Sequence, residues 1–375
     1  MADNAVRKQD IETPALVIDL DALERNMDKI ERDLQHSAAK LRPHAKSHKT
    51  PEIALKQLER GAVGITCAKM GEAEAMVEGG VDRVLISSEL IGASKNRRAA
   101  ELAKRAEVIV ACENEFNVKE LAHAARLAGS TPGAIIEADI GNRRCGVRSA
   151  EQAVALARII ADEPALRFRG IMGYEGQCVF IKQFDERRQA ADKAISTLLE
   201  MAHAIENAGI PVEIVSAGGT GTYNITGLFP GVTDIQVGSY ILMDARYGSI
   251  EGINFEQSLY VLSTVVSRPL SDLAILDYGL KSVPAEFGFA SPAPSTYRDG
   301  SHNAFGIDGT EVIGLSEEHA RLALKNPSRD LKVGDKVDIV PTHCCTTMNT
   351  HDRVYVVRGD TVEAIWNITA RGKCV

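Results

Sequence analysis

The segment 42–49 holds the residue best suited to covalent chemistry, because a lysine stands where a short apolar run ends. The run 41–45 is predicted to be a strand, which places Lys46 at its carboxyl end. Partial desolvation there would lower the pKa of the amine, and a neutral amine can form a Schiff base with a carbonyl compound. Lys49 competes with it but lies beyond the strand, and His44 is a further candidate binding residue. The alternative interpretation is a surface loop rich in cations.

A glycine-rich run follows a later apolar run and has the composition of a phosphate-binding loop. Glycines let backbone N–H groups approach a phosphate closely, and threonine hydroxyls can donate to it. The loops after the last two strands of a barrel are a frequent phosphate site, although glycine turns are common in any loop. A lysine that faces a phosphate cradle is what pyridoxal phosphate requires. The candidate cofactor-binding residues are Gly218, Gly219, Thr220, Gly221, Gly238, Ser239 and Tyr240.

Two other apolar runs also end on polar side chains. Arg144 follows the run 134–139 and can hydrogen-bond the phenolic oxygen of a pyridoxal cofactor, which helps to set the protonation of the imine. The alternative is an Arg–Asp pair that only fixes the loop. Tyr174 ends the run 168–174 and is either a wall of the cofactor site or a core aromatic, and Glu175 after it is a candidate catalytic carboxylate.

A histidine and two cysteines near the carboxyl end of the chain suggest a metal site. If the segment 341–346 is extended, His343 and Cys345 point to the same face and Cys344 points away. A neutral imidazole and a thiolate suit zinc. Two side chains leave positions open for water or substrate, which is typical of a catalytic site. The alternative is two buried cysteines and a capped histidine.

The elements that must position these residues alternate from about residue 40 to 244. Short, continuously apolar runs are typical of strands covered on both faces. Eight alternations with amphipathic stretches favour a closed (β/α)₈ barrel, and an open doubly wound sheet is the alternative. The predicted strands are 41–45, 63–68, 83–88, 108–112, 134–139, 168–174, 212–216 and 234–240.

The amphipathic stretches between these runs predict helices with recognisable ends. Asn117 and Ser149 are predicted N-caps. Gly61, Gly129 and Gly209 follow helix ends in the way that C-cap glycines do. The predicted helices are 52–60, 95–105, 117–128, 150–160 and 185–208.

After about Gly252 the helical pattern nearly vanishes and β-rich runs separated by turn residues take over. This predicts a smaller antiparallel β domain at residues 253–375, joined by residues 11–19, after a barrel domain at 20–252. Its predicted strands are 260–266, 273–276, 336–340, 353–357 and 362–366.

The composition limits the class of protein. A chain of 375 residues that is 45% apolar can form a barrel and a smaller partner domain. The net charge of −8 argues against a nucleic-acid or anionic-membrane partner, and no apolar run is long enough to span a bilayer. Seven cysteines, an odd number in a long chain, do not form a disulfide framework and favour a reducing cytoplasm.

Together these motifs resemble the D-threonine aldolase and D-serine dehydratase family, which shares the alanine-racemase type of pyridoxal-phosphate fold. The resemblance extends from residues 13–20 to residues 366–372. Its most specific parts are 42–49 with 51–55, 218–221, 238–240 with 243–244, and 343–345.

The resemblance implies roles for the candidate residues. Lys46 would carry the cofactor, Arg144 would contact its phenolic oxygen, and the glycine-rich run would hold its phosphate. His343 and Cys345 would bind a divalent metal (Zn, Mn or Mg) that contacts the β-hydroxyl of a small amino-acid substrate. Family members are typically homodimers in which the β domain of one subunit closes the barrel mouth of the other.

The implied reaction is retro-aldol cleavage of a D-β-hydroxy-α-amino acid to glycine and an aldehyde. A dehydratase that yields a keto acid and ammonia is the alternative, because Cys345 stands where the aldolases carry aspartate. Phe180 stands where they carry a histidine proposed as the base, and phenylalanine cannot accept a proton. Glu175, Lys182 or a hydroxide on the metal would have to replace it.

An amino-acid racemase and a non-catalytic pyridoxal-phosphate carrier are further alternatives. A racemase would need a second acid–base group, normally a tyrosine of the β domain, and nothing near Tyr260, Tyr297 or Tyr355 marks that role. A carrier would need neither the metal pair nor the second domain. A purely structural protein would leave the lysine and the phosphate cradle without a purpose.

Overall fold

A computed structural model describes residues 6–295 and 305–375 and divides the chain into two compact units. The barrel unit comprises Ile30–Gly238, Ile250–Ile253 and Lys373–Val375, and the antiparallel unit comprises Met1–Lys29, Ser239–Ser249 and Asn254–Gly372. No helix of the described residues has both the length and the apolar character that a membrane span requires.

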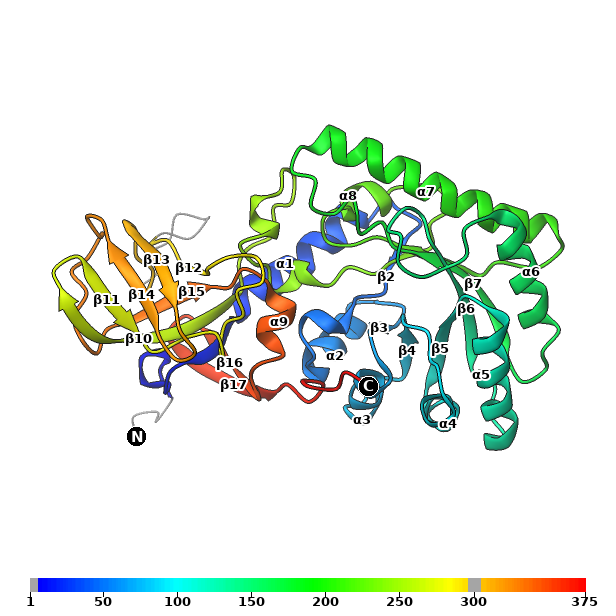
Figure 1. Ribbon diagram of the computed structural model, residues 1–375, viewed down its shortest axis with the longest axis horizontal. Helices are drawn as coiled ribbons and strands as arrows, with labels where there is room; N and C mark the ends of the chain where they lie inside the picture. The colour runs from blue at the N-terminus through cyan, green and yellow to red at the C-terminus, as the bar shows by residue number, and fades with distance from the viewer. Residues whose placement is uncertain (1–5, 296–304) are drawn as a thin grey trace. The chain divides into compact units, whose positions relative to one another are not determined.

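The barrel unit contains eight parallel strands in the order β2-β9-β8-β7-β6-β5-β4-β3 (Figure 1). The two ends of this order also meet, because a β-bridge joins His44 to Thr66 and the Val63 N–H donates to the Leu41 carbonyl oxygen at 2.8 Å. The predicted (β/α)₈ barrel is therefore confirmed. Its strands are β2 (Lys40–Leu41), β3 (Ile65–Cys67), β4 (Arg83–Ile86), β5 (Glu107–Cys112), β6 (Gly133–Ala138), β7 (Arg167–Gly173), β8 (Ile214–Ala217) and β9 (Asp234–Ile235).

Several predicted strands are too long, among them 63–68 and 83–88, and two of these errors concern candidate site residues. The first strand ends at Leu41, and Lys46 lies in the 3₁₀ turn η2 (Ala45–Ser47). Pro43 has no N–H to donate to a strand ladder, and the His44 side chain caps the turn. The last strand ends at Ile235, and Ser239 and Tyr240 lie in a second 3₁₀ turn, η3 (Ser239–Ile241).

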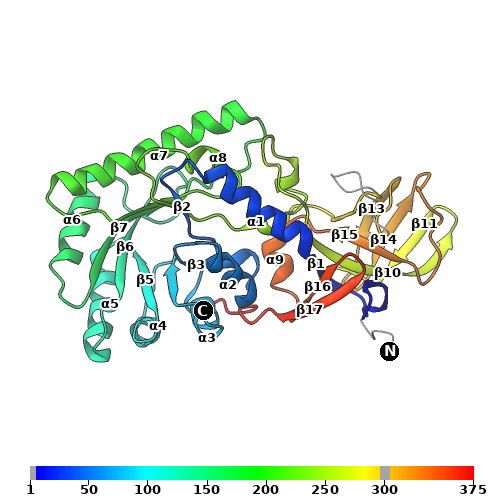
Figure 2. The ribbon, with the colours of Figure 1, turned by 180° about the vertical axis from the view of Figure 1, so that it is seen from behind.

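The helices of the barrel unit lie outside its strands (Figure 2). Ser149 caps its helix as predicted, since its side chain accepts from the Gln152 N–H, and Gly129 ends a helix in the left-handed region. Asn117 is not an N-cap: Asn114 is, and the two asparagines form a reciprocal capping box. The helices are α2 (Pro51–Glu59), α3 (Met70–Glu78), α4 (Ala93–Leu102), α5 (Glu115–Ala128), α6 (Ala150–Ala161), α7 (Phe184–Asn207) and α8 (Tyr223–Thr226).

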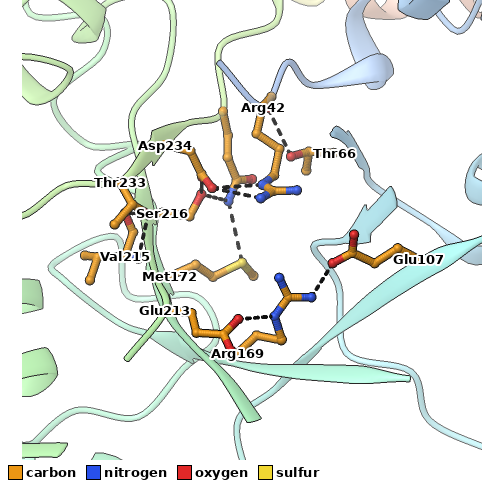
Figure 3. Close-up of polar contacts among 11 residues, drawn as sticks. Arg42, Thr66, Glu107, Arg169, Met172, Glu213, Val215, Ser216, Thr233 and Asp234 are labelled. Atoms are coloured by element: carbon orange, nitrogen blue, oxygen red, sulfur yellow. Dashed lines mark hydrogen bonds and ion pairs between the residues drawn. The ribbon is translucent and has the colours of Figure 1, made fainter. Parts of the chain in front are cut away.

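A buried ion pair fastens the strand that leads to Lys46. Figure 3 shows Arg42 turned toward Asp234, whose Oδ2 accepts from Arg42 Nε at 3.0 Å, while Ser216 donates to the other oxygen of Asp234. Both members of the pair are almost fully buried. Removing one partner of such a pair leaves an uncompensated buried charge, which costs about 3–5 kcal/mol. The pair therefore fixes the residue that follows β2 to strand β9, four residues before Lys46.

The antiparallel unit is built on a second, nine-stranded sheet, in which β1 pairs antiparallel with β10 and parallel with β16. The sequence analysis missed β12, β13 and β14. The residues of β14 (Ala-Arg-Leu-Ala-Leu) favour helix, and pairing with β11 and β13 overrides that preference. Its strands are β1 (Ala15–Asp19), β10 (Leu259–Leu270), β11 (Leu273–Leu276), β12 (Ser291–Pro292), β13 (Thr310–Leu315), β14 (Ala320–Leu324), β15 (Lys336–Val340), β16 (Arg353–Arg358) and β17 (Thr361–Asn367).

Helix α1 (Leu20–Leu34) follows β1, and α9 (Cys344–Met348) follows β15. Two short 3₁₀ turns complete the described elements, η1 (Lys8–Asp10) and η4 (Tyr247–Ser249).

Candidate active site

The turn η2 presents Lys46, whose amine lies near an aromatic ring. His44 Nδ1 accepts from the Lys46 N–H at 3.4 Å, and the Lys46 Nζ lies 5.6 Å from the ring centroid of Tyr174. Within the described part of the chain, no carboxylate lies at ion-pair distance from this amine. Lys49, by contrast, pairs with the buried carboxylate of Glu72 at 3.0 Å. Lys46 is therefore the available nucleophile of the segment.

The two histidines beside Lys46 are held neutral. Burial, followed by the charges of Lys46 and Lys49, lowers the pKa of His44 well below its ordinary value. Burial also lowers the pKa of His48 to about 3. Neither imidazole adds positive charge near the Lys46 amine at neutral pH.

Arg144 faces the same aromatic ring as Lys46, with its Cζ 5.8 Å from the ring centroid of Tyr174. Its Nη2 donates to Glu137 Oε1 at 3.2 Å. The Arg–Asp pair considered from the sequence does exist in this loop, but it joins Arg148 to Asp139 at 3.2 Å. Arg144 is thus not the residue that fixes the loop to Asp139.

The glycine-rich run 218–221 is anchored by Glu175, which is fully buried. Glu175 Oε2 accepts from the Gly218 N–H at 3.1 Å. Its Oε1 accepts from the hydroxyls of Thr222 at 2.7 Å and Thr226 at 2.6 Å. Donors therefore occupy both oxygens of the carboxylate, which suits Glu175 to positioning the loop.

The run needs glycine because its neighbours leave no room for side chains. Gly218 has a φ of +84°, and a Cβ on Gly221 would lie 1.9 Å from the Val179 carbonyl oxygen. A Cβ on Gly219 would lie 3.2 Å from Tyr174 Cε2, which places the run against the ring that Lys46 and Arg144 face. The structure therefore brings Lys46, Tyr174, Arg144 and the glycine run together.

Gly238 packs on the Lys46 turn, since a Cβ there would lie 3.1 Å from both the His44 carbonyl oxygen and Ser47 Oγ. Ser239 and Tyr240 belong to the antiparallel unit. Tyr240 is buried and packs edge-on against Phe255, with ring centroids 5.5 Å apart.

In the antiparallel unit, His343, Cys344 and Cys345 place their ligand atoms within 4.8 Å of one another. The expected extended conformation is wrong, because α9 begins at Cys344 and the helical turn brings Cys344 beside the other two. Asp244 Oδ2 contacts His343 Nδ1 at 3.0 Å and accepts from the Cys344 N–H at 3.0 Å. Asp244 lies in the motif 243–244, but no role for it was predicted from the sequence.

Charges around this trio are strongly coupled. Burial opposes the imidazolium, but hydrogen bonds to Asp244 and Cys345 raise the pKa of His343 to about 10. Burial and the neighbouring Cys345 raise the pKa of the Cys344 thiol. A divalent cation would replace the proton of His343, because a metal binds the neutral imidazole.

These arrangements fit the two groups that the sequence implied. The amine of Lys46 and the guanidinium of Arg144 lie beside a glycine run that has no room for side chains. This combination suits an aldehyde that carries a phosphate. An imidazole oriented by a buried carboxylate, with thiols beside it, suits a divalent metal.

A second cluster escaped the sequence analysis. Ligand atoms of Glu89, Glu113 and Cys145 also lie within 4.8 Å of one another. Glu89 and Glu113 follow β4 and β5, and Glu137 belongs to the neighbouring strand β6. Their positions at the ends of successive strands could have predicted this cluster, because the carboxyl ends of parallel strands meet at one rim of the barrel.

Known proteins resemble the chain over nearly its whole length. The alanine racemase N-terminal domain family matches residues 18–245, and the serine dehydratase domain family matches residues 258–357. A D-threonine aldolase of Arthrobacter sp is 36% identical over 365 residues, which are 96% of this chain and 93% of that protein. A 3-hydroxy-D-aspartate aldolase of Paracoccus denitrificans (strain Pd 1222) is 36% identical over 376 residues, 98% of this chain and 94% of that protein.

The crystal structure of a D-threonine aldolase from Filomicrobium marinum has a TM-score of 0.92 and 35% identity, with 100% of both chains covered. A D-threo-3-hydroxyaspartate dehydratase of Delftia sp. (strain HT23) is 26% identical over 355 residues, 90% of this chain and 92% of that protein. The matches therefore include both aldolases and a dehydratase.

Proposed function

Because the chain belongs to the family that joins an alanine racemase N-terminal domain to a serine dehydratase domain, we propose that it is a pyridoxal-phosphate-dependent lyase. Its reaction would be cleavage of D-β-hydroxy-α-amino acids to glycine and an aldehyde, as the names of its aldolase relatives suggest. One observation carries the proposal: the Lys46 amine and the Arg144 guanidinium face one tyrosine ring beside a glycine cradle.

Bound pyridoxal phosphate supplies an electron sink for the Cα of an amino acid, and a divalent metal supplies a Lewis acid for its β-oxygen. Lys46 provides the amine that holds the coenzyme, and Arg144 donates to its phenolic oxygen. The run 218–221 with Gly238 holds the phosphate, and Tyr174 forms a wall. Roles for Ser239 and Tyr240 in phosphate binding, and for His44 as a direct contact, remain predictions from the sequence.

His343 and Cys345 are the proposed metal ligands, with Cys344 beside them. Asp244 accepts from the backbone of Cys344 and contacts His343 Nδ1, which leaves His343 Nε2 to face a metal. Imidazole and thiolate ligands favour zinc over manganese or magnesium.

Two of the three candidate bases considered from the sequence are side chains, Glu175 and Lys182, and the structure describes both. Glu175 is buried and accepts from three donors, so we propose that it positions the phosphate loop and exchanges no proton with the substrate. Lys182 is exposed. The predicted homodimer and cytoplasmic location rest on the sequence alone.

Dehydration to a keto acid and ammonia is the second candidate reaction. Cys345 at the metal cluster and the dehydratase of Delftia among the relatives favour it. The two reactions differ in whether the Cα–Cβ bond or the Cα–H bond breaks.

Borohydride reduction of the protein with pyridoxal phosphate, followed by peptide mapping, tests the proposal. We expect one labelled peptide, modified at Lys46. Incubation of the unreduced holoenzyme with D-threonine, D-serine and 3-hydroxy-D-aspartate should release glycine and an aldehyde, whereas ammonia and a keto acid would indicate the dehydratase. Label on another lysine, or on none, would refute the role of Lys46.

A further inference from the structure

Three glutamates gather at the carboxyl ends of neighbouring barrel strands, and two of them touch. The side chains of Glu89 and Glu137 lie in hydrogen-bond contact, and Glu137 is 4% exposed. An ionised carboxylate only accepts hydrogen bonds. Contact between two carboxyl groups therefore requires a proton between them.

The surroundings of the two carboxyl groups suit one negative charge on the pair. Glu137 Oε1 accepts from Arg144 Nη2 at 3.2 Å, so Glu137 has a cation beside it. Glu89 Oε1 is buried and has no hydrogen-bond partner among the described residues. A buried oxygen without a donor is far less costly on a neutral acid than on a carboxylate. The pair as a whole therefore holds one proton.

The groups around the pair reinforce this charge state. Burial, followed by the charge and hydrogen bond of Glu89, raises the pKa of Glu137 to about 8, against the opposing charge of Arg144. Burial and the same carboxylates raise the pKa of the Cys145 thiol to about 11. Glu113 accepts from the Gly146 N–H at 2.5 Å, and its ligand atom lies within 4.8 Å of those of Glu89 and Cys145.

We propose that Glu89 and Glu137 share one proton and thereby act as positioning residues for Arg144, presenting it with a single negative charge. Arg144 then keeps N–H groups free for the phenolic oxygen of the coenzyme, a placement that rests on the proposed function. Loss of the shared proton would double the negative charge and draw Arg144 toward the pair.

This arrangement makes Glu89→Gln a rescue variant. An amide has the shape of a protonated carboxyl group and can donate to Glu137, but it cannot lose its proton in the working range of pH. Glu89→Gln should therefore keep the affinity for pyridoxal phosphate at neutral pH. It should also keep that affinity in alkali, where the wild type loses it.

Infrared spectroscopy of the full-length protein without coenzyme tests the shared proton directly. At neutral pH we expect a carboxylic-acid carbonyl band that is lost in Glu89→Gln and in Glu137→Gln. The control Glu101→Gln, which changes an exposed ion pair with Lys104, should retain the band. Circular dichroism identifies any variant that fails to fold. If the wild-type spectrum equals that of both folded variants, the proposal is wrong, whatever the protein binds.

A titration with pyridoxal phosphate tests the link to Arg144. Above about pH 8, the dissociation constant of the wild type should rise by up to about tenfold per pH unit more than that of Glu89→Gln. Equal pH profiles in the two proteins would overturn the positioning role. An acid band that appears only after a chelator removes divalent cations would show that the carboxylates hold a cation in place of the proton.

Discussion

In the barrel unit, the Lys46 amine faces the ring of Tyr174, whereas in the antiparallel unit His343 Nδ1 lies 3.0 Å from the buried carboxylate of Asp244. The difference matches the chemistry proposed for each nitrogen. An amine that bonds to carbon must shed its proton, and a carboxylate partner would stabilise the charged form. An imidazole that binds a metal must be turned toward it, and a carboxylate on the other nitrogen achieves this.

Carboxylates in both units hold the neighbours of the reactive groups. Glu72 holds Lys49, Glu137 holds Arg144 and Glu175 holds the glycine-rich run 218–221, while the Lys46 amine has no carboxylate partner among the described residues. Asp244 holds His343 and the backbone of Cys344 in the same way. If this comparison is right, coenzyme binding and metal binding can be removed separately.

Lys46→Ala should have the largest effect. Loss of the amine removes the covalent attachment, so we expect no visible absorption band from bound pyridoxal phosphate and a fall in turnover on the order of 10⁴-fold or more. Metal content, measured by elemental analysis, should be unchanged. Lys49→Arg is the matched control, since arginine preserves the charge opposite Glu72, and it should keep the band. A normal band in Lys46→Ala would break the comparison.

His343→Ala is the converse variant. Removing the imidazole takes away one ligand of the trio and the partner of Asp244, so bound metal and turnover should both fall by about 100-fold or more. The visible band of the coenzyme should persist. Chelation of the wild type should reproduce this result. Full activity after removal of all detectable metal would exclude the trio from the mechanism.

Asp244→Asn tests whether the charge of this carboxylate supports metal binding, because it keeps the size of the side chain and removes its charge. We expect about 10–100-fold weaker metal binding, the usual cost of losing a carboxylate that orients a metal-binding histidine. Equilibrium dialysis against zinc measures it. An unchanged affinity would mean that Asp244 fixes α9 through the Cys344 backbone alone.

Glu175→Gln tests the carboxylate that holds the glycine-rich run in the barrel unit, as Asp244 holds His343 in the antiparallel unit. Hydrogen bonds to a charged group contribute about 1.5–3 kcal/mol each, and an amide can still accept one or two of them. We therefore expect pyridoxal phosphate to bind roughly tenfold more weakly, with little change in the rate at saturating coenzyme. A large loss of that rate with unchanged affinity would instead make Glu175 the missing base.

The sequence predicted the barrel because its strands are continuously apolar, and it placed Lys46, Arg144 and the glycine run because each follows such a run. It misplaced the ends of the first and last strands. Pro43 and the cap that His44 supplies stop the first strand early, and a 3₁₀ turn replaces the end of the last. Local pattern identifies an apolar run, whereas the point at which its hydrogen bonds cease depends on the neighbouring strand.

The sequence analysis mainly missed the carboxylates that hold other functional residues in place. Asp244, Glu72 and Glu137 act on residues that lie 99, 23 and 7 positions away along the chain. No periodicity or spacing encodes such a pair, because the fold alone brings the two side chains together. Glu175 was recognised as polar and well placed, but its three donors come from the glycine-rich loop and helix α8, more than 40 residues later.

His48 gives the smallest expected effect and tests whether burial keeps this histidine neutral, in contrast to His343. Burial lowers the pKa of His48 from its ordinary 6.5 to about 3. Between these values the unfolded chain binds a proton that the folded chain does not, so the stability that depends on neutral His48 is lost as the pH falls below 6.5. The slope is at most ~1.4 kcal/mol per pH unit.

His48→Asn removes this titration and keeps an acceptor for the Thr50 N–H, which His48 Nδ1 accepts at 3.2 Å. Urea unfolding between about pH 7 and pH 4.5 should therefore show a shallower acid decline in the variant than in the wild type. His123→Asn, at an exposed position of α5, should leave the decline unchanged. Identical slopes in wild type and His48→Asn would mean that His48 takes up its proton without unfolding, and the contrast between His48 and His343 would not hold.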